Sequence, residues 1–275
     1  MSDWLGDLRK LRTELADTVR YTLIHEDQSF CLNDYLGQSL KLSHSGLIRC
    51  VACDRITKKS FNQGHCYPCF RKLAACDSCI VSPEKCHFAE GTCREPEWAA
   101  QNCQVPHIVY LAHTSSIKVG ITRATQVPTR CMDQGATQAK PIARVQTRHQ
   151  SGLLEVLCAR EISDRTAWQT MLKGNGVPQD LEHARQTLMA TCEPGLTELR
   201  AEHGEGAFEL LQDAPETQID YPVITWPEKV KAHNFDKQSV VEGTLMGIKG
   251  QYLMLDTGVL NIRKFGGYEV EVQVI

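Results

Sequence analysis

Cysteines constrain this chain more than any other residue type, because nine of its 13 cysteines lie between Cys50 and Cys103. Six of the nine form pairs in which two residues separate the cysteines. The pairs are Cys50 and Cys53, Cys66 and Cys69, and Cys76 and Cys79. Two thiolates at this spacing can turn back onto one metal ion, as they do in tetrahedral zinc sites. This part of the chain is therefore expected to fold around metal.

Two structural zinc ions are expected. The first site is predicted at Cys50, Cys53, Cys66 and Cys69, because four thiolates close a tetrahedral site. The second is expected to begin with Cys76 and Cys79, and its other ligands to come from Cys86, Cys93 and Cys103. Proximity favours Cys86 and Cys93, with Cys103 able to replace either. An iron–sulfur cluster is the alternative at this second site, because thiolate spacing alone does not separate the two metals.

The cysteine spacing also indicates a compartment in which thiols stay reduced. Disulfides are the alternative, but the first residues, Met1 to Trp4, lack the basic and apolar regions of a secretory signal. No apolar run approaches the roughly 20 residues that span a bilayer. We expect a cytoplasmic protein that does not act at a membrane.

The pattern of apolar residues predicts an α+β protein of several domains. Trp4, Leu8, Leu11 and Leu15 fall on one face of an expected N-terminal helix. A strand over 19–24 and a hairpin over 38–49, with its turn at 43–46, are expected next. The expected divisions are 1–49 (helix and strands), 50–106 (zinc module), 107–176 (central module), 177–220 (acidic helical connector) and 221–275 (β-rich). Short strands broken by glycine predict a small barrel in the last division, which the N-terminal strands could complete.

Charge is distributed unevenly along the chain, although the net charge is only −3. Residues 107–173 contain nine Lys and Arg against four Asp and Glu, whereas residues 174–220 contain two against ten. The basic region could follow a phosphate backbone, and the alternative is a solvated charged face.

The central module is expected to have the order ββαβα followed by one more helix. Tyr110 lies in its first strand, Lys118-Val119-Gly120 in its second, Arg130 in its first helix and Glu155 in a later helix. In this arrangement the module resembles the GIY-YIG endonuclease superfamily. Ile108-Val109-Tyr110 takes the place of the first family motif and Lys118-Val119-Gly120 that of the second. Two departures are isoleucine for the first glycine and lysine for the second tyrosine.

The resemblance implies phosphodiester hydrolysis, and the four side chains suit that chemistry. The Arg130 guanidinium could neutralise phosphate oxygens, and Glu155 could hold Mg²⁺ or Mn²⁺. Tyr110 could accept a proton if a cation such as Lys118 lowers its pKa from about 10. Because the motif departs from the family pattern, binding without cleavage stays open.

Over nearly its whole length the chain also resembles a prokaryotic domain-of-unknown-function family, number 2797, which implies metal and architecture but no reaction. The expected partner is nucleic acid, either DNA or RNA. Three functions remain open: a nucleic-acid-binding protein that cleaves its ligand, a non-catalytic adaptor associated with RNA or the ribosome, and a protein-interaction scaffold.

Overall fold

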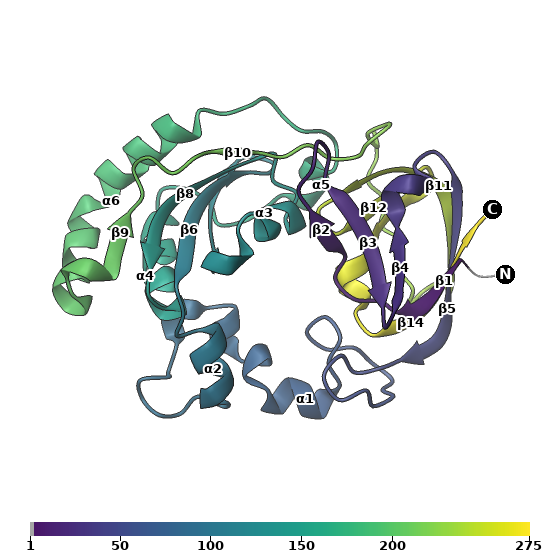
Figure 1. The fold of residues 1–275 in the computed structure, drawn as a ribbon, viewed down its shortest axis with the longest axis horizontal. Helices are drawn as coiled ribbons and strands as arrows, with labels where there is room; N and C mark the ends of the chain where they lie inside the picture. The colour runs from purple at the N-terminus through teal and green to yellow at the C-terminus, as the bar shows by residue number, and fades with distance from the viewer. Residues whose placement is uncertain (1–2) are drawn as a thin grey trace.

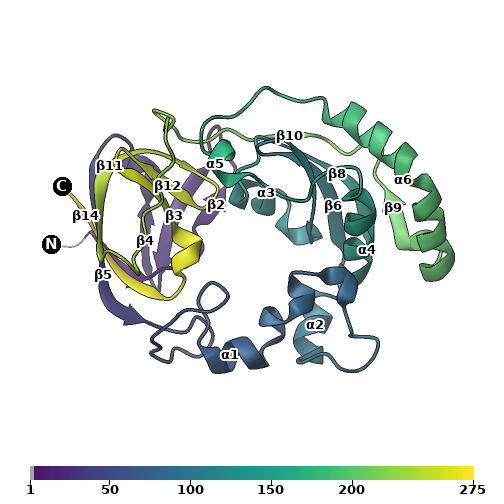
Figure 2. The same ribbon diagram turned by 180° about the vertical axis from the view of Figure 1, so that it is seen from behind.

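The computed structural model describes residues 3–275, and the chain folds into three parts (Figure 1). Strands from both ends of the chain form the first part. A second antiparallel sheet, partly covered by helices, forms the second. The cysteine-rich segment, residues 50–106, connects these two parts along one side (Figure 2).

The first part contains a six-stranded antiparallel sheet in the order β1-β14-β5-β11-β12-β13. Its strands are β1 (Trp4–Asp7), β5 (Ser39–Ile48), β11 (Val240–Lys249), β12 (Tyr252–Leu255), β13 (Gly258–Asn261) and β14 (Tyr268–Val274). A three-stranded sheet of β2 (Arg12–Glu14), β3 (Arg20–His25) and β4 (Gln28–Cys31) shares its hydrophobic core. Within residues 3–275, β1 and β13 are the two edges of the larger sheet. The expected barrel is therefore not closed.

The expected N-terminal helix is wrong, because the segment forms β1 and β2 instead. Trp4, Leu8 and Leu11 are buried as the pattern indicated, but β1 obtains its backbone hydrogen bonds from β14. Gly6 has no room for a side chain, since an added Cβ would lie 2.3 Å from the His25 ring. Pairing with a distant strand overrides the helical spacing here.

The expected hairpin over 38–49 is also wrong, because these residues form the single ten-residue strand β5. The strand pairs with β11 through residues 39–43 and with β14 on its other side, and the bend at Gly46, which has a φ of +93°, is an irregularity within the β14 pairing rather than a hairpin turn. Two partners satisfy the backbone groups of β5 better than a turn would.

The second part is a five-stranded sheet with β6 (His107–His113) between β7 (Ile117–Arg123) and β8 (Gln138–Val145). Two short strands, β9 (Phe208–Leu210) and β10 (Thr217–Gln218), pair with β8. The helices α3 (Thr129–Asp133), α4 (Arg148–Cys158) and α5 (Trp168–Met171) follow their strands in the expected order.

All seven residues of β6 are buried because both faces of the sheet are covered. Val109 and Leu111 pack in the core with α4 and α6 (Leu181–His203), whereas Tyr110 and Ala112 pack in the core of the first part. The helix α6 of the acidic segment also contributes to the core, because it buries Leu188 and Leu196 against this sheet (Figure 1).

The cysteine-rich segment contains only two short α-helices, α1 (Tyr67–Lys72) and α2 (Pro96–Asn102), with 3₁₀ turns between them. Two of these turns, η3 (Ser78–Ile80) and η4 (Pro83–Lys85), lie against the second part. None of the helices described for residues 3–275 is both long and apolar enough to traverse a bilayer.

Candidate functional site

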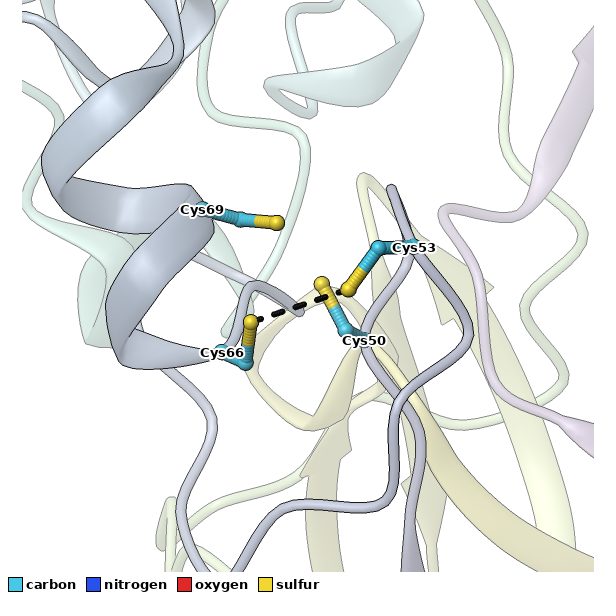
Figure 3. Close-up of side chains that lie close together, drawn as sticks. All are labelled: Cys50, Cys53, Cys66 and Cys69. Carbon is cyan, nitrogen blue, oxygen red and sulfur yellow. Dashed lines mark hydrogen bonds between the residues drawn. The ribbon is translucent and has the colours of Figure 1, made fainter.

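Four cysteines form a candidate metal site between the end of β5 and α1. The Sγ atoms of Cys50, Cys53, Cys66 and Cys69 all lie within 4.8 Å of one another, and those of Cys53 and Cys66 are 3.8 Å apart (Figure 3). Four converging thiolates are the donor set of a closed structural zinc site. This cluster can hold a zinc ion, as the cysteine spacing predicts.

Local backbone conformation turns the thiols toward one another. Cys50 lies two residues after the end of β5, and Cys66 is the N-cap residue of α1. Between the pairs, Gly64 has a φ of +132°, and a Cβ there would lie 2.2 Å from Val51. Burial raises the pKa of Cys50, but the N–H groups of Cys66, Ala52 and Cys53 outweigh it and lower the pKa to about 6. Cys50 is therefore prepared to bind metal as a thiolate.

A cleft of about 630 Å³ lies where the three parts of the molecule meet. All three parts contribute to its walls. Gln63 comes from the cysteine-rich segment, Lys118 from the second part and Arg263 from the first part. Six cationic side chains line it, against three carboxylates. The cations are Lys10, Lys118, Arg123, Arg130, Arg148 and Arg263, and the carboxylates are Asp133, Glu155 and Asp164. A concave surface with this charge balance favours an anionic ligand.

Three of the four side chains singled out in the sequence line this cleft: Lys118, Arg130 and Glu155. They come from β7, α3 and α4, three elements of the second part. The fourth, Tyr110, is 1% exposed and lies behind the wall. Its hydroxyl donates to Gln134 Oε1 at 3.0 Å, and Gln134 itself lines the cleft.

Gly120 explains how Tyr110 reaches the back of the cleft. The two residues are paired across β6 and β7, and a Cβ on Gly120 would lie 2.8 Å from the tyrosine hydroxyl. Only glycine leaves space for the ring to cross the neighbouring strand. Burial raises the pKa of Tyr110, and this effect opposes the phenolate form that a general base requires.

The charged groups in the cleft have perturbed pKa values. Burial, and then the neighbouring Asp164, raises the pKa of Glu155 to about 7 despite the nearby arginines and Lys118. Burial, and then Arg130, lowers the pKa of Lys118 to about 8. Within residues 3–275, neither side chain forms a hydrogen bond or an ion pair. Partly buried groups of this kind can bind ligand or transfer protons near neutral pH.

The carboxylates in the cleft differ in their availability to a hard cation. Asp133 is engaged by Lys10 at 2.5 Å, by Thr13 and by Gln251 at 3.0 Å. Within residues 3–275, Glu155 faces the same cleft without a hydrogen-bond or ion-pair partner, whereas Asp164 forms an ion pair only with the exposed Arg165, at 3.8 Å. Their oxygens suit Mg²⁺ or Mn²⁺, which is consistent with the expected role of Glu155.

Sequence reasoning missed several cleft residues, above all Arg148 and Arg263. Arg148 could have been found, because it precedes Glu155 by seven residues on α4 and so lies on the same helical face. Arg263 lies in the 3₁₀ turn η7 (Ile262–Phe265), and Lys10 precedes β2. No sequence signal connects these two residues to the central module, because only the folded chain brings them together.

The remaining cysteines of the segment divide into two environments. Cys79, Cys86, Cys93 and Cys103 line one small cavity between η3, η4 and α2. Cys76, which the sequence groups with Cys79, does not line that cavity. Its thiol lies near Asn62, on the side of the four-cysteine centre.

Comparison with known proteins gives a family but no activity. No curated protein and no solved structure matches the chain. The model of one protein family, described as "Protein of unknown function (DUF2797)", matches residues 37–270. This match covers most of the chain, including the four-cysteine centre and every side chain of the cleft except Lys10. The chain therefore belongs to the DUF2797 family of proteins of unknown function.

Proposed function

We propose that this protein binds nucleic acid in the basic cleft and hydrolyses a phosphodiester bond there with the help of a divalent cation. The observation that carries the proposal is that Lys118, Arg130 and Glu155 line one cleft, although they are far apart in sequence. The resemblance of the central module to GIY-YIG endonucleases supports the same reaction class. The surrounding arginines supply the charge that a polyanion needs.

The side chains of the cleft can perform the steps of this reaction. Arg130 binds the non-bridging oxygens of the phosphate, because its planar guanidinium matches them in geometry and charge. Glu155, with Asp164 beside it, would hold Mg²⁺ or Mn²⁺, which stabilises charge on the leaving oxygen. Lys118 is the group that takes the proton from the attacking water, because its pKa of about 8 leaves a useful neutral fraction near pH 7.

Tyr110 has a different role from the one that the sequence suggests. Its buried hydroxyl keeps its proton and donates a hydrogen bond to Gln134 Oε1, so Tyr110 positions a residue of the cleft wall. In this proposal Tyr110 is a positioning residue, and Lys118 replaces it as the proton acceptor.

Cleavage assays with labelled single- and double-stranded DNA and RNA test the proposal. With Mg²⁺ or Mn²⁺ present, we expect cleavage that Glu155→Gln abolishes while binding remains. The cleavage rate of Tyr110→Phe should fall by less than about tenfold. That of Lys118→Met should fall by at least about a hundredfold, as expected for a proton-transfer group. Glu161→Gln and Lys173→Met, both exposed, are the matched controls. Absence of binding to every nucleic acid at low salt contradicts the proposal.

A second candidate, binding without cleavage, is favoured by the burial of Tyr110 and by the departures at Ile108 and Lys118. An adaptor of this kind binds nucleic acid with a steep salt dependence but leaves it intact with every divalent cation. Arg130→Gln should weaken its binding more than Arg165→Gln, because the Arg165 side chain is 91% exposed and lies outside the cleft. The same assays therefore separate the two candidates.

A further inference from the structure

The cavity lined by Cys79, Cys86, Cys93 and Cys103 points to a second metal centre. We propose that these four thiolates bind one zinc ion and that Cys76 is not a ligand. The four residues come from η3, from the end of η4, from the loop before α2 and from the end of α2. They line the same cavity although up to 24 positions separate them in the sequence.

The size and lining of the cavity support a single ion. Its volume is about 10 Å³, which is the space of one small ion or water rather than of a four-iron cluster. Besides the four cysteines, the wall contains Asp77 and five apolar side chains, namely Ala74, Ile80, Phe88, Trp98 and Ala99. In such an apolar site four thiols stabilise one another only weakly. A bound cation would stabilise all four as thiolates.

Charge around the cavity also favours a bound metal. Arg148 lies beside Cys103 and Cys79, and its buried Nε has no hydrogen-bond partner within residues 3–275. A zinc ion with four thiolates carries a net negative charge and would offset the charge of this buried guanidinium.

An alternative ligand set uses the carboxylate of Asp77 and the ring of His87, whose ligand atoms lie within 4.8 Å of the Cys79 thiol and of each other. These two groups already have partners. The Asp77 carboxylate accepts from the Ser78 N–H at 2.6 Å and forms an ion pair with Arg94 at 2.8 Å. His87 Nδ1 is 2.8 Å from the hydroxyl of Thr92. Cys86, Cys93 and Cys103 lack comparable partners and are the better ligands.

The second centre would also shape the proposed functional cleft. Ile80 lines both the cavity and the cleft, and its carbonyl accepts from the Arg148 guanidinium at 2.7 Å. The turn η4 lies against α4 so closely that a Cβ on Gly152 would be 2.5 Å from the Glu84 nitrogen. A metal between η3, η4 and α2 thus fixes the wall that faces Glu155. The metal assignment itself does not depend on the proposed function.

Metal analysis of the full chain tests this inference. The wild type is expected to contain about two zinc ions per chain. Cys79→Ser, Cys93→Ser and Cys103→Ser should each contain about one, and the matched control Cys76→Ser should keep about two. One zinc in the wild type, or loss of an ion from Cys76→Ser with retention in Cys103→Ser, overturns the assignment. Iron with acid-labile sulfide in the wild type overturns it as well.

A second measurement keeps the inference testable if the serine variants do not fold. X-ray absorption of the wild type reports the mean number of sulfur ligands per zinc. About four sulfurs are expected when both centres contain only thiolates. A mean clearly below four, with nitrogen or oxygen ligands, contradicts the inference and supports the set that includes Asp77 and His87.

Discussion

At the scale of single residues, Gly120 leaves the space that the Tyr110 ring occupies behind the wall of the cleft. Tyr110 can lie across β7 only because the paired residue has no side chain, and its hydroxyl then reaches Gln134. In the Lys118-Val119-Gly120 sequence, the glycine is therefore needed for steric reasons and the lysine for the proposed chemistry.

Gly120→Ala is expected to destabilise the protein by about 1–3 kcal/mol, because the new Cβ displaces a fully buried ring. Denaturant unfolding measures the change. Gly206→Ala is the matched control, since a Cβ there meets no atom within 4 Å, and its effect should stay within about 0.5 kcal/mol. Equal effects of the two substitutions would contradict the steric explanation.

The Glu155 carboxyl predicts a pH-dependent difference in stability. Its pKa is raised from 4.5 to about 7 in the folded chain, so it contributes stability that is complete below about pH 4.5 and lost as pH rises through 7. Glu155→Gln cannot ionise and avoids that loss. Without added divalent cations, the Tm of the variant relative to wild type should rise between pH 4.5 and about pH 8. A constant difference, like that expected for exposed Glu161→Gln, would contradict this prediction.

At the scale of secondary structure, α4 organises both the cleft and its border with the cysteine-rich segment. A capping box begins the helix, in which the Thr147 hydroxyl accepts from the Gln150 N–H and the Gln150 side chain accepts from the Thr147 N–H. Arg148 and Glu155 then follow on one face. The N-terminal cap thus fixes the position of two charged residues of the cleft.

Thr147→Ala should cost about 1 kcal/mol of stability, because it leaves an N–H at the start of α4 without its partner. Thermal unfolding checks the change. Thr197→Ala, at an exposed position within α6, removes a hydroxyl of the same size without a capping role and should change stability by less than about 0.5 kcal/mol. A larger loss from the control would contradict the capping argument.

Local patterns predicted the central elements and the first zinc site, but not the strands that depend on distant partners. The order of β6, β7, α3, β8 and α4 follows from alternation, turns and helical spacing within one stretch of chain. The spacing of Cys50 and Cys53 is equally local. In contrast, the 4–11 segment has helical spacing but becomes a strand because β14, some 260 residues later, supplies its partner. Lys10 and Arg263 enter the cleft for the same nonlocal reason.

At the scale of the whole molecule, the Gln251 side chain links the first part, which is built from both ends of the chain, to α3 of the second part. Its side chain accepts from the Leu11 N–H at 2.7 Å and donates to Asp133 Oδ1 at 3.0 Å. It is 3% exposed. One amide thus satisfies groups from the N-terminal strands and from α3, while it belongs to the turn before β12.

Gln251→Ala should destabilise the protein by about 2–4 kcal/mol, because it leaves the buried N–H of Leu11 without its partner, removes one of the three side chains that bind Asp133, and opens a cavity. Urea unfolding followed by fluorescence measures the effect. Gln28→Ala, at an exposed position of β4, is the matched control and should be close to neutral. If Gln251→Ala is equally neutral, the amide does not stabilise this junction.

The place of β14 between β1 and β5 has a consequence for how the protein is made. A ribosome releases β1 and β5 more than 200 residues before the strand that separates them has been synthesised. Until then both nascent strands expose backbone groups that any other extended chain could capture. Translation must therefore proceed through β14 before the sheet can assemble, and chains truncated before Tyr268 should be insoluble or rapidly degraded.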